Sequence, residues 1–548
     1  MKKNKFIPLM VSLLVVKCVC CQESPEIKSI LNKVSPQAIE GTMRFLSDDL
    51  LEGRLPGTRG FALGSAYMQS QFVALGLTPG MSDTSFVQNV PLQKGWVETD
   101  GTSLTLQDAD GKKMPLRLGK EFLMQPYFPS AKSAVTGELV FAGFGVSAPE
   151  FNYDDYAKLD VKGKIVVFLL GAPKSFPSSE RAYFSTIDVK YKEAIKRGAF
   201  GVIVVPAVRI NPDAWDGILR RSKSGTYKWA DKDGNVASGY AALKATAIFN
   251  PQYLESLFVH SPVNAQEIFA MAAEGKSQSF PLHISASMQV ATASKQVESS
   301  NLVGVIKGSD PVLKNEYVVY SAHLDHLGIG SPVNKDSIYN GAHDDASGNA
   351  ILLEIARVYR SLKTKPKRSI VFAIVTGEEM GLLGSDYFIN HLPFPDGKVV
   401  ANLAIDMPFF FHPVLDIVPY GADHSSLGIQ TIRAAKELGL TISPDPFPEQ
   451  VIFIRSDHYS FIQKGIPALF IKSGFMTVPS DTVNRAKSDV GWRSTIYHTP
   501  KDDMNQPFDF KAATTHVKIN FLIGYYVSNQ TAKPFWNSGD FFGKKFGQ

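Results

Sequence analysis

The chain has 548 residues, of which 44% are hydrophobic and 20% charged, so it is long enough for several domains with buried cores and shows no bias towards disorder. Four of its 57 basic residues lie within the first 21 positions, which hold no acidic residue. The remainder is nearly neutral, with 52 acidic residues, and gives no reason to expect a nucleic-acid partner.

Residues 1–21 match the pattern of a secretory signal peptide: a basic start, a mostly apolar run and small residues before position 22. The apolar run is too short to cross a bilayer as a helix, so no transmembrane span is predicted. The three cysteines, Cys18, Cys20 and Cys21, all lie here, so the body has no thiol chemistry. Cleavage after Cys21 predicts an extracytoplasmic protein, periplasmic or secreted. Lipid attachment to one of these cysteines, which would anchor the protein to a membrane, is the open alternative.

The chain after this leader is predicted to begin with helices. Apolar residues between Phe61 and Leu75 follow a helical stripe, and Gly76 suits the end of that helix. We expect residues 22–97 to form a helical segment that packs on the C-terminal half.

From residue 98 to residue 290 the pattern changes to short strands separated by glycine and proline. Residues 137–146 and 163–171 are apolar enough for buried strands, and residues 188–205 indicate a helix, a glycine turn and a strand. We therefore expect an inserted β-rich module here, with residues 211–235 as an exposed polar excursion.

Residues 291–530 alternate strands with helices, which predicts an α/β domain with a mixed, largely parallel sheet flanked by helices. Three apolar runs, at 317–322, 370–376 and 399–405, each lead into acidic or imidazole side chains. Open α/β sheets place ligands and catalytic groups at the carboxyl ends of their strands. Residues 531–548 form an aromatic, glycine-rich tail.

Six side chains in this half have the chemistry of a site for two divalent metal ions. Such a site needs imidazole and carboxylate ligands, one carboxylate shared by both ions, and a spare carboxylate to carry a proton. The six are His323, Asp344, Glu378, Glu379, Asp406 and His498. Neighbouring residues that leave a strand end point in different directions, so one of the two adjacent glutamates can bind metal while the other reaches a water.

The segments around these residues resemble those of the M28 family of zinc exopeptidases. In chain order they read SAHLDHLG, GAHDDASG, GEEMGLLGS, NLAIDMP, RSDHYSF and YHTPKDD. One departure is Ala404, which stands where the family pattern has an asparagine two residues before the ligand aspartate. The resemblance is strong over residues 297–529, and the β-rich module is more loosely similar to the protease-associated (PA) insertion of such enzymes.

The resemblance implies a zinc-exopeptidase fold, two zinc ions per chain and a role for each site residue. The implied ligands are Asp344 as the bridge, His323 with Asp406 on one ion, and Glu379 with His498 on the other. Glu378 is then the general base and acid, and Asp325 orients the metal ligand His323 without itself binding metal.

The expected activity is hydrolysis of peptides by a metal-activated water, with an aminopeptidase favoured. Three alternatives stay open: a carboxypeptidase, a glutaminyl-cyclase-like transferase that works with one zinc, and a non-catalytic receptor-like relative. The last would be expected to have lost some ligands or the base, and the set is complete here. The oligomeric state is not predicted.

Several further residues near the motifs have both structural and functional interpretations. For Arg455 we favour a salt bridge over a clamp for a substrate carboxylate, and for Tyr497 packing over a role at the oxyanion. Asp457 and His458 either shape the pocket or are structural. The remaining histidines that lack the context of a ligand are His326, His343, His412 and His424.

Overall fold

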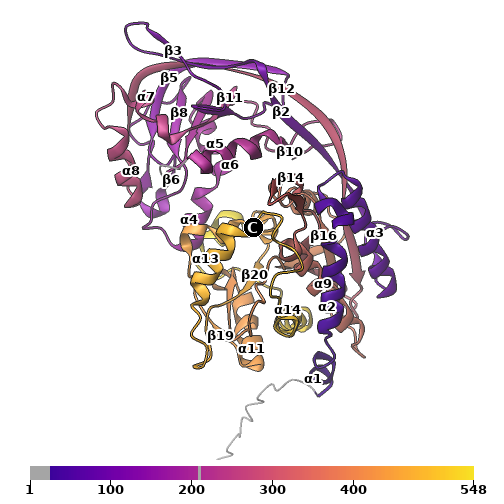
Figure 1. Cartoon of the computed structure of the whole chain (residues 1–548). Helices are drawn as coiled ribbons and strands as arrows, with labels where there is room; N and C mark the ends of the chain where they lie inside the picture. The colour runs from indigo at the N-terminus through magenta and orange to yellow at the C-terminus, as the bar shows by residue number, and fades with distance from the viewer. Residues whose placement is uncertain (1–24, 208–211, 548) are drawn as a thin grey trace, which may run out of the picture.

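The computed structural model describes residues 25–207 and 212–547 (Figure 1). The predicted signal peptide and its cysteines lie outside these residues. Figure 1 shows a lower part, which holds the C-terminal half of the chain, and an upper part that arches over it. Among the helices of the described residues, none is both long enough and apolar enough to cross a membrane.

The lower part is built on a mixed sheet with a parallel centre. In sheet order its strands are β19 (Thr441–Ile442), β18 (Asp416–Tyr420), β20 (Ala468–Ser473), β17 (Lys398–Ala404), β13 (Glu316–His323), β16 (Ser369–Val375) and β12 (Ser279–Ile306). The strands β20, β17, β13 and β16 are parallel. At the two ends of this group, β18 runs antiparallel to β20, and β12 runs antiparallel to β16. The three apolar runs predicted as strands are β13, β16 and β17, and the predicted fold class is confirmed.

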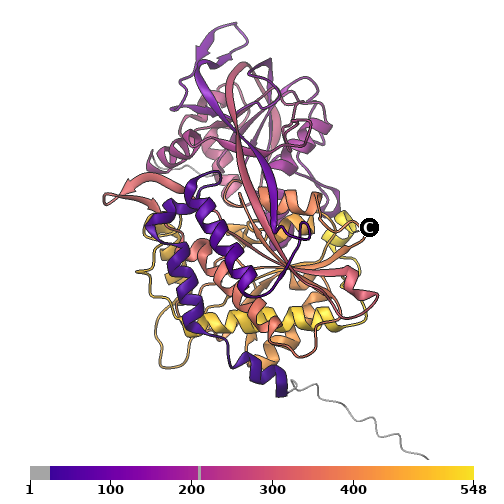
Figure 2. The ribbon, with the colours of Figure 1, turned by 90° about the vertical axis from the view of Figure 1, so that its right-hand side faces the viewer.

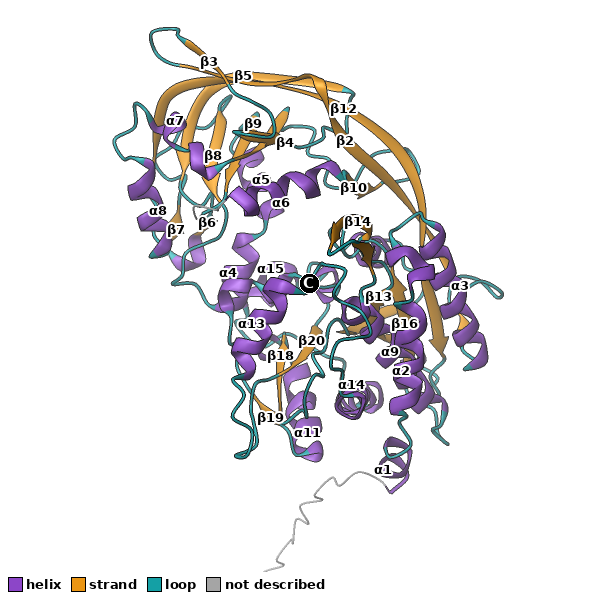
Figure 3. Ribbon diagram, in the orientation of Figure 1, coloured by secondary structure: helices purple, strands orange, loops and turns teal. Residues whose placement is uncertain are grey.

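Helices cover both faces of this sheet (Figure 3). One face carries α1 (Pro25–Leu31), α2 (Pro36–Leu46), α3 (Arg59–Ala74), α9 (Ser347–Arg360), α11 (Leu427–Leu438) and α14 (Phe510–Asn529), and the other carries α10 (Leu383–Asn390) and α12 (His458–Ile462). Side chains alternate along β13. Val318 and Tyr320 therefore pack against the helices of the first face, and Val319 lies in the core on the face of α10 and α12. Burial on both faces explains why these strands are continuous apolar runs in the sequence.

The upper part continues the same sheet through two long strands. β2 (Val87–Gln107) pairs with β12 over most of its length, and Figure 2 shows the two rising together from the lower part. Beyond β12 the order is β5 (Lys132–Ala142), β8 (Ile165–Leu169), β9 (Gly201–Val205), β11 (Ala245–Phe249) and β4 (Phe122–Met124). The helices of this part are α4 (Ser178–Ser185), α5 (Ile187–Lys196), α7 (Glu255–Phe258) and α8 (Ala265–Ala273). The predicted boundaries at 97/98 and 290/291 fall inside β2 and β12, and the division into domains stays a prediction.

Most of the described residues between 214 and 235 are exposed or half-buried, as expected, but the segment is not an irregular excursion. It forms α6 (Pro212–Lys223) and β10 (Thr226–Trp229), and β10 pairs antiparallel with β2. Trp215 and Tyr227 are each only 4% exposed. The segment is ordered because its aromatic side chains find buried positions, which its polar and glycine-rich composition concealed.

The N-terminal helices begin and end as their sequence predicts. The hydroxyl of Ser35 caps α2 by accepting the backbone N–H of Ala38 at 3.1 Å. α3 is followed by Gly76, whose φ of 65° is one that glycine adopts without strain. Between the two helices a short turn buries Arg54 beneath the carboxyl edge of the sheet.

Candidate metal centre

The predicted site residues gather at one edge of the parallel sheet. His323 is the last residue of β13, Glu378 and Glu379 follow β16, and Asp406 follows β17. Because parallel neighbours end at the same edge, these side chains converge. Asp344 arrives from the turn before α9, and His498 from the turn after α13 (Arg485–Thr495).

Asp344 lies between two groups of donor atoms. Its Oδ1 is 3.2 Å from Nε2 of His323, and its Oδ2 is 3.2 Å from Nε2 of His498. Nε2 of His323 lies 3.9 Å from Oδ1 of Asp406, and Nε2 of His498 lies 3.0 Å from Oε2 of Glu379. One carboxylate thus faces two imidazole and carboxylate pairs, as a ligand shared by two ions must.

The donor atoms are placed to bind metal ions, because several of them form no hydrogen bonds with one another. One atom from each of His323, Asp344 and Asp406 lies within 4.8 Å of the others. Within the described residues, several buried donor atoms have no hydrogen-bond partner: Nε2 of His323, Oδ1 of Asp406, Oε1 of Glu379 and Nε2 of His498. Buried polar atoms are rarely left unpaired, and imidazole nitrogen with carboxylate oxygen is the ligand chemistry of zinc. The residues present therefore fit two such ions.

His326 is a donor that the sequence analysis leaves outside the ligand set. Its buried ring places Nδ1 at 2.6 Å from Oε1 of Glu379 and at 3.9 Å from Oδ2 of Asp344, and these three residues form a second candidate metal triad. The available signal was the second histidine of SAHLDHLG, three positions after His323 at the same strand end.

Electrostatics keep Asp344 and Glu379 ionised. Burial by itself raises the pKa of Asp344, but the neighbouring imidazoles of His323 and His498 hold that pKa well below its usual value. Burial also raises the pKa of Glu379, and the nearby charge of His498 outweighs it and lowers the pKa to about 2. The pKa of His498 is lowered by burial yet raised to about 10 by Glu379 and Asp344. Metal binding here must release that proton.

Glu378 differs from Glu379 in its surroundings. Its side chain is 11% exposed and lines the pocket, whereas Glu379 is 4% exposed and turned to the histidines. Burial raises the pKa of Glu378 well above its usual value, with the charge of His323 opposing and that of Asp406 reinforcing the change. A carboxylate next to the donors, open to the pocket and with a high pKa is suited to exchanging protons.

Asp325 contacts both His323 and the backbone of the two adjacent glutamates. Its backbone carbonyl lies 3.1 Å from Nδ1 of His323, and its carboxylate accepts the backbone N–H groups of Glu378 at 3.2 Å and Glu379 at 3.3 Å. Burial raises its pKa to about 7. Asp325 therefore positions the two glutamates as well as the imidazole for which it was predicted.

Two supporting residues were not predicted. Arg54, 1% exposed, donates to the carbonyl of Leu324 at 2.8 Å and to those of Asn340 and Gly341 at 2.6 and 3.0 Å. It thereby holds the segments that carry His323 and Asp344. Asp502, fully buried, accepts the backbone N–H groups of His343 at 2.8 Å and Asp344 at 3.0 Å.

Of the flanking residues, Arg455 and Tyr497 line the pocket at the metal centre. Arg455 forms no ion pair among the described residues, so the favoured salt bridge is wrong; it donates to the Tyr497 hydroxyl at 3.0 Å. The Tyr497 ring stacks on His498, with 3.7 Å between ring centroids. His458 stacks on Phe470, and burial lowers its pKa to about 3. Asp457 is buried, which raises its pKa to about 6.

Residues 301–522 match the model of peptidase family M28. The aminopeptidase NAALADL1 of Mus musculus is 35% identical over 142 residues, which are 25% of this chain and 17% of that protein. A probable zinc metalloprotease of Pyricularia oryzae is 39% identical over 263 residues, which are 42% of this chain and 50% of that protein. The chain thus spans half or less of the length of either relative.

The solved structure of an aminopeptidase from Aneurinibacillus sp. strain AM-1 superimposes with a TM-score of 0.52 at 22% identity. The superposition covers 92% of this chain and 97% of that one, so the overall fold is shared. All six predicted site residues lie inside the segment matched by the family. Residues 301–522 of this chain are therefore similar to peptidase family M28.

Proposed function

We propose that this chain is a zinc-dependent exopeptidase, an aminopeptidase that works with two zinc ions. The observation that carries the proposal is the position of Asp344 between the pair His323 and Asp406 and the pair His498 and Glu379. The matches to a protein named an aminopeptidase and to one named a probable zinc metalloprotease support it. The leader pattern supports an extracytoplasmic location.

Zinc ions held by these donors would lower the pKa of a bound water and polarise the scissile carbonyl. Glu378 accepts the proton of that water on its carboxylate and returns it to the departing amine. Asp325 keeps Glu378 aimed at the pocket through its hydrogen bond to the backbone N–H. Cations at the neighbouring donors would favour the charged form of Glu378, the form that accepts a proton.

The test is a panel of amino-blocked and unblocked peptides, assayed with and without chelation and with Glu378→Gln. This variant keeps the shape of the side chain, so we expect two zinc ions per chain and a loss of turnover of about 10²–10⁴-fold. Exposed Glu449 provides the matched control Glu449→Gln, which should keep full activity.

Each alternative has its own result. Full activity of Glu378→Gln would show that the proposed base is wrong. Cleavage of blocked peptides from their carboxyl end would identify a carboxypeptidase. One zinc per chain with cyclisation of N-terminal glutamine would identify the transferase, and tight zinc binding without turnover would identify a binding protein.

A further inference from the structure

The pocket at the metal centre has one acidic wall and one basic wall. The space in and in front of this narrow pocket, open solvent included, is about 330 Å³. The acidic wall is made of the donors already described. The charged side chains of the other wall are Arg455, Lys472 and Arg493.

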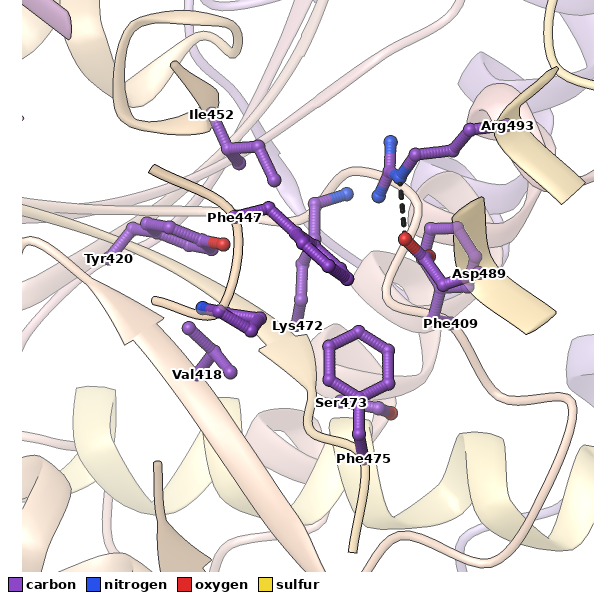
Figure 4. A pocket seen from close by; sticks show the side chains of 11 residues that line it. Phe409, Val418, Tyr420, Phe447, Ile452, Lys472, Ser473, Phe475, Asp489 and Arg493 are labelled. Atoms are coloured by element: carbon purple, nitrogen blue, oxygen red, sulfur yellow. Dashed lines mark hydrogen bonds and ion pairs between the residues drawn. The ribbon is translucent and has the colours of Figure 1, made fainter. Parts of the chain in front are cut away.

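A second pocket adjoins the first, since Ile452, Lys472 and Arg493 line both. It holds about 280 Å³, and aromatic rings form much of its remaining wall, among them those of Tyr420, Phe447 and Phe475 (Figure 4). Figure 4 shows the amino group of Lys472 and the guanidinium of Arg493 on the same side of this space, next to Ile452. Lys472 and Arg493 therefore lie between the metal centre and the adjoining pocket, which a substrate side chain could enter.

Lys472 is a buried cation without an acidic partner. It lies on β20, is 5% exposed, and donates from Nζ to the backbone carbonyls of Asp406 at 3.3 Å and Met407 at 2.9 Å. Among the described residues, no carboxylate forms an ion pair with this nitrogen. These bonds use two of the three donors of the ammonium group, and the same nitrogen lies 4.7 Å from the ring centroid of Phe470 and 5.4 Å from that of Phe409. A carboxylate would have to compete with these weaker ring contacts for the third donor. With cations bound to Asp344 and Asp406, neither carboxylate is free to balance the charge of Lys472.

Arg493 is only partly neutralised. Its Nε donates to Oδ2 of Asp489 at 2.9 Å, the ion pair drawn in Figure 4, and its side chain is 13% exposed. This bond leaves the terminal nitrogens of the guanidinium for the pocket, and guanidinium groups bind carboxylates through two parallel hydrogen bonds. Lys472, Arg493 and Asp489 together carry one net positive charge.

We propose that Lys472 and Arg493 bind the carboxylate of an acidic side chain next to the scissile bond, so that the enzyme prefers peptides beginning with Asp or Glu. The proposal rests on the aminopeptidase activity proposed above. The aromatic walls are suited to the methylene groups of such a side chain, and the two cations repel an N-terminal Lys or Arg.

A carboxylate can also come from the free C-terminus of a dipeptide, and the test separates the two sources. The zinc-loaded enzyme is assayed on the p-nitroanilides of Glu, Gln, Leu and Lys, which have no C-terminal carboxylate, and on Leu-Gly and Leu-Gly-amide. We expect kcat/KM for Glu to exceed that for its neutral isostere Gln by roughly 10- to 100-fold, the range carried by one hydrogen bond to a charged group. The kcat/KM values for Leu-Gly and Leu-Gly-amide should differ little.

Two variants report on the two cations. Lys472→Met should remove most of the advantage of Glu over Gln, mainly by raising KM for Glu. Arg493→Gln should do the same, and it leaves the contacts of Lys472 with the Asp406 segment in place. The matched control is Lys487→Met, which removes an exposed cation from α13, the helix that carries Arg493.

Several results would overturn the proposal. If the wild-type enzyme cleaves Leu and Gln anilides but gains nothing with Glu, the acidic preference is wrong while the peptidase proposal stands. If Leu-Gly far exceeds its amide and Glu has no advantage, the cations bind a C-terminus instead. If Lys472→Met and Arg493→Gln lower turnover of Glu and Leu anilides by the same factor, both residues only support the metal ligands. Failure of the zinc-loaded enzyme on every substrate would refute both proposals.

Discussion

The support of the metal centre by Arg54 can be tested with the substitution Arg54→Lys. The guanidinium donates from Nε to the carbonyl of Leu324 and from its terminal nitrogens to those of Asn340, Gly341 and Leu46. Lysine keeps the positive charge, which faces several buried carboxylates of the centre. Lysine has one nitrogen where the planar guanidinium of arginine has three, so it cannot donate to all four of these carbonyls.

The structure sets the size of the expected effect. At least two of the four carbonyls lose their partner, and each buried unpaired group costs about 1–3 kcal/mol, which predicts a loss of about 2–6 kcal/mol in the free energy of unfolding. That loss is a large part of the roughly 5–15 kcal/mol that stabilises a typical domain. Because Leu324 follows His323 and Gly341 precedes Asp344 by three residues, zinc affinity should fall as well, by about 10–100-fold.

The measurements are denaturant unfolding with a chelator present and zinc titration against a competing chelator. Arg44→Lys is the matched control, because Arg44 lies on α2 and forms only a surface ion pair with Glu40. Such pairs contribute about 0–1 kcal/mol, so this control should unfold almost like the wild type. If Arg54→Lys also unfolds within about 0.5 kcal/mol of the wild type and binds zinc equally well, the supporting role assigned to Arg54 is wrong.

Two further predictions concern other parts of the chain. His326→Ala removes the nitrogen 2.6 Å from Glu379 and should weaken zinc affinity at one site by about 10–100-fold. His391→Ala, a change at an exposed histidine, should leave zinc affinity unchanged. If the zinc content of His326→Ala after dialysis equals that of the wild type, His326 only packs beside the site. Burial raises the pKa of Asp540, but its hydrogen bond with His424 outweighs burial and holds the pKa below the usual value. The resulting stabilisation is complete above the pKa of an unfolded aspartate, about pH 4, and is lost as the pH falls through the lower folded pKa. Hydrogen-exchange protection of α15 (Phe541–Phe546) should therefore drop below that pH in the wild type but show no such step in Asp540→Asn.

The parts of the fold that could be predicted are those in which one local pattern suffices. β13, β16 and β17 are apolar because both of their faces are buried, and the residue after such a strand has to lie at the sheet edge. β2 and β12 escaped prediction because half of each strand faces solvent and their length far exceeds that of an ordinary strand. Their composition therefore resembled that of several short strands.

The supporting residues of the centre could not be predicted for a different reason. Arg54 acts on carbonyls about 270 and 286 residues away, and a carbonyl leaves no mark in the sequence. Asp502 and Asp503 are adjacent and chemically identical. The first turns inward to hold the turn before Asp344, and the second caps a surface turn at Asn505. Only the three-dimensional path of the chain decides between them.

The upper part of the molecule takes part in shaping the pocket. Asp445 accepts the hydroxyl of Ser178, on α4, at 2.6 Å, and it also accepts the hydroxyl of Tyr420 at 3.1 Å and the backbone N–H of Phe447 at 3.0 Å. Tyr420 and Phe447 line the aromatic pocket beside Lys472. One half-buried carboxylate thus ties the upper part to two residues that line the pocket. A displacement of α4 therefore changes the walls that would receive the first side chain of a peptide, while the metal donors, anchored on the sheet edge by Arg54 and Asp502, stay in place.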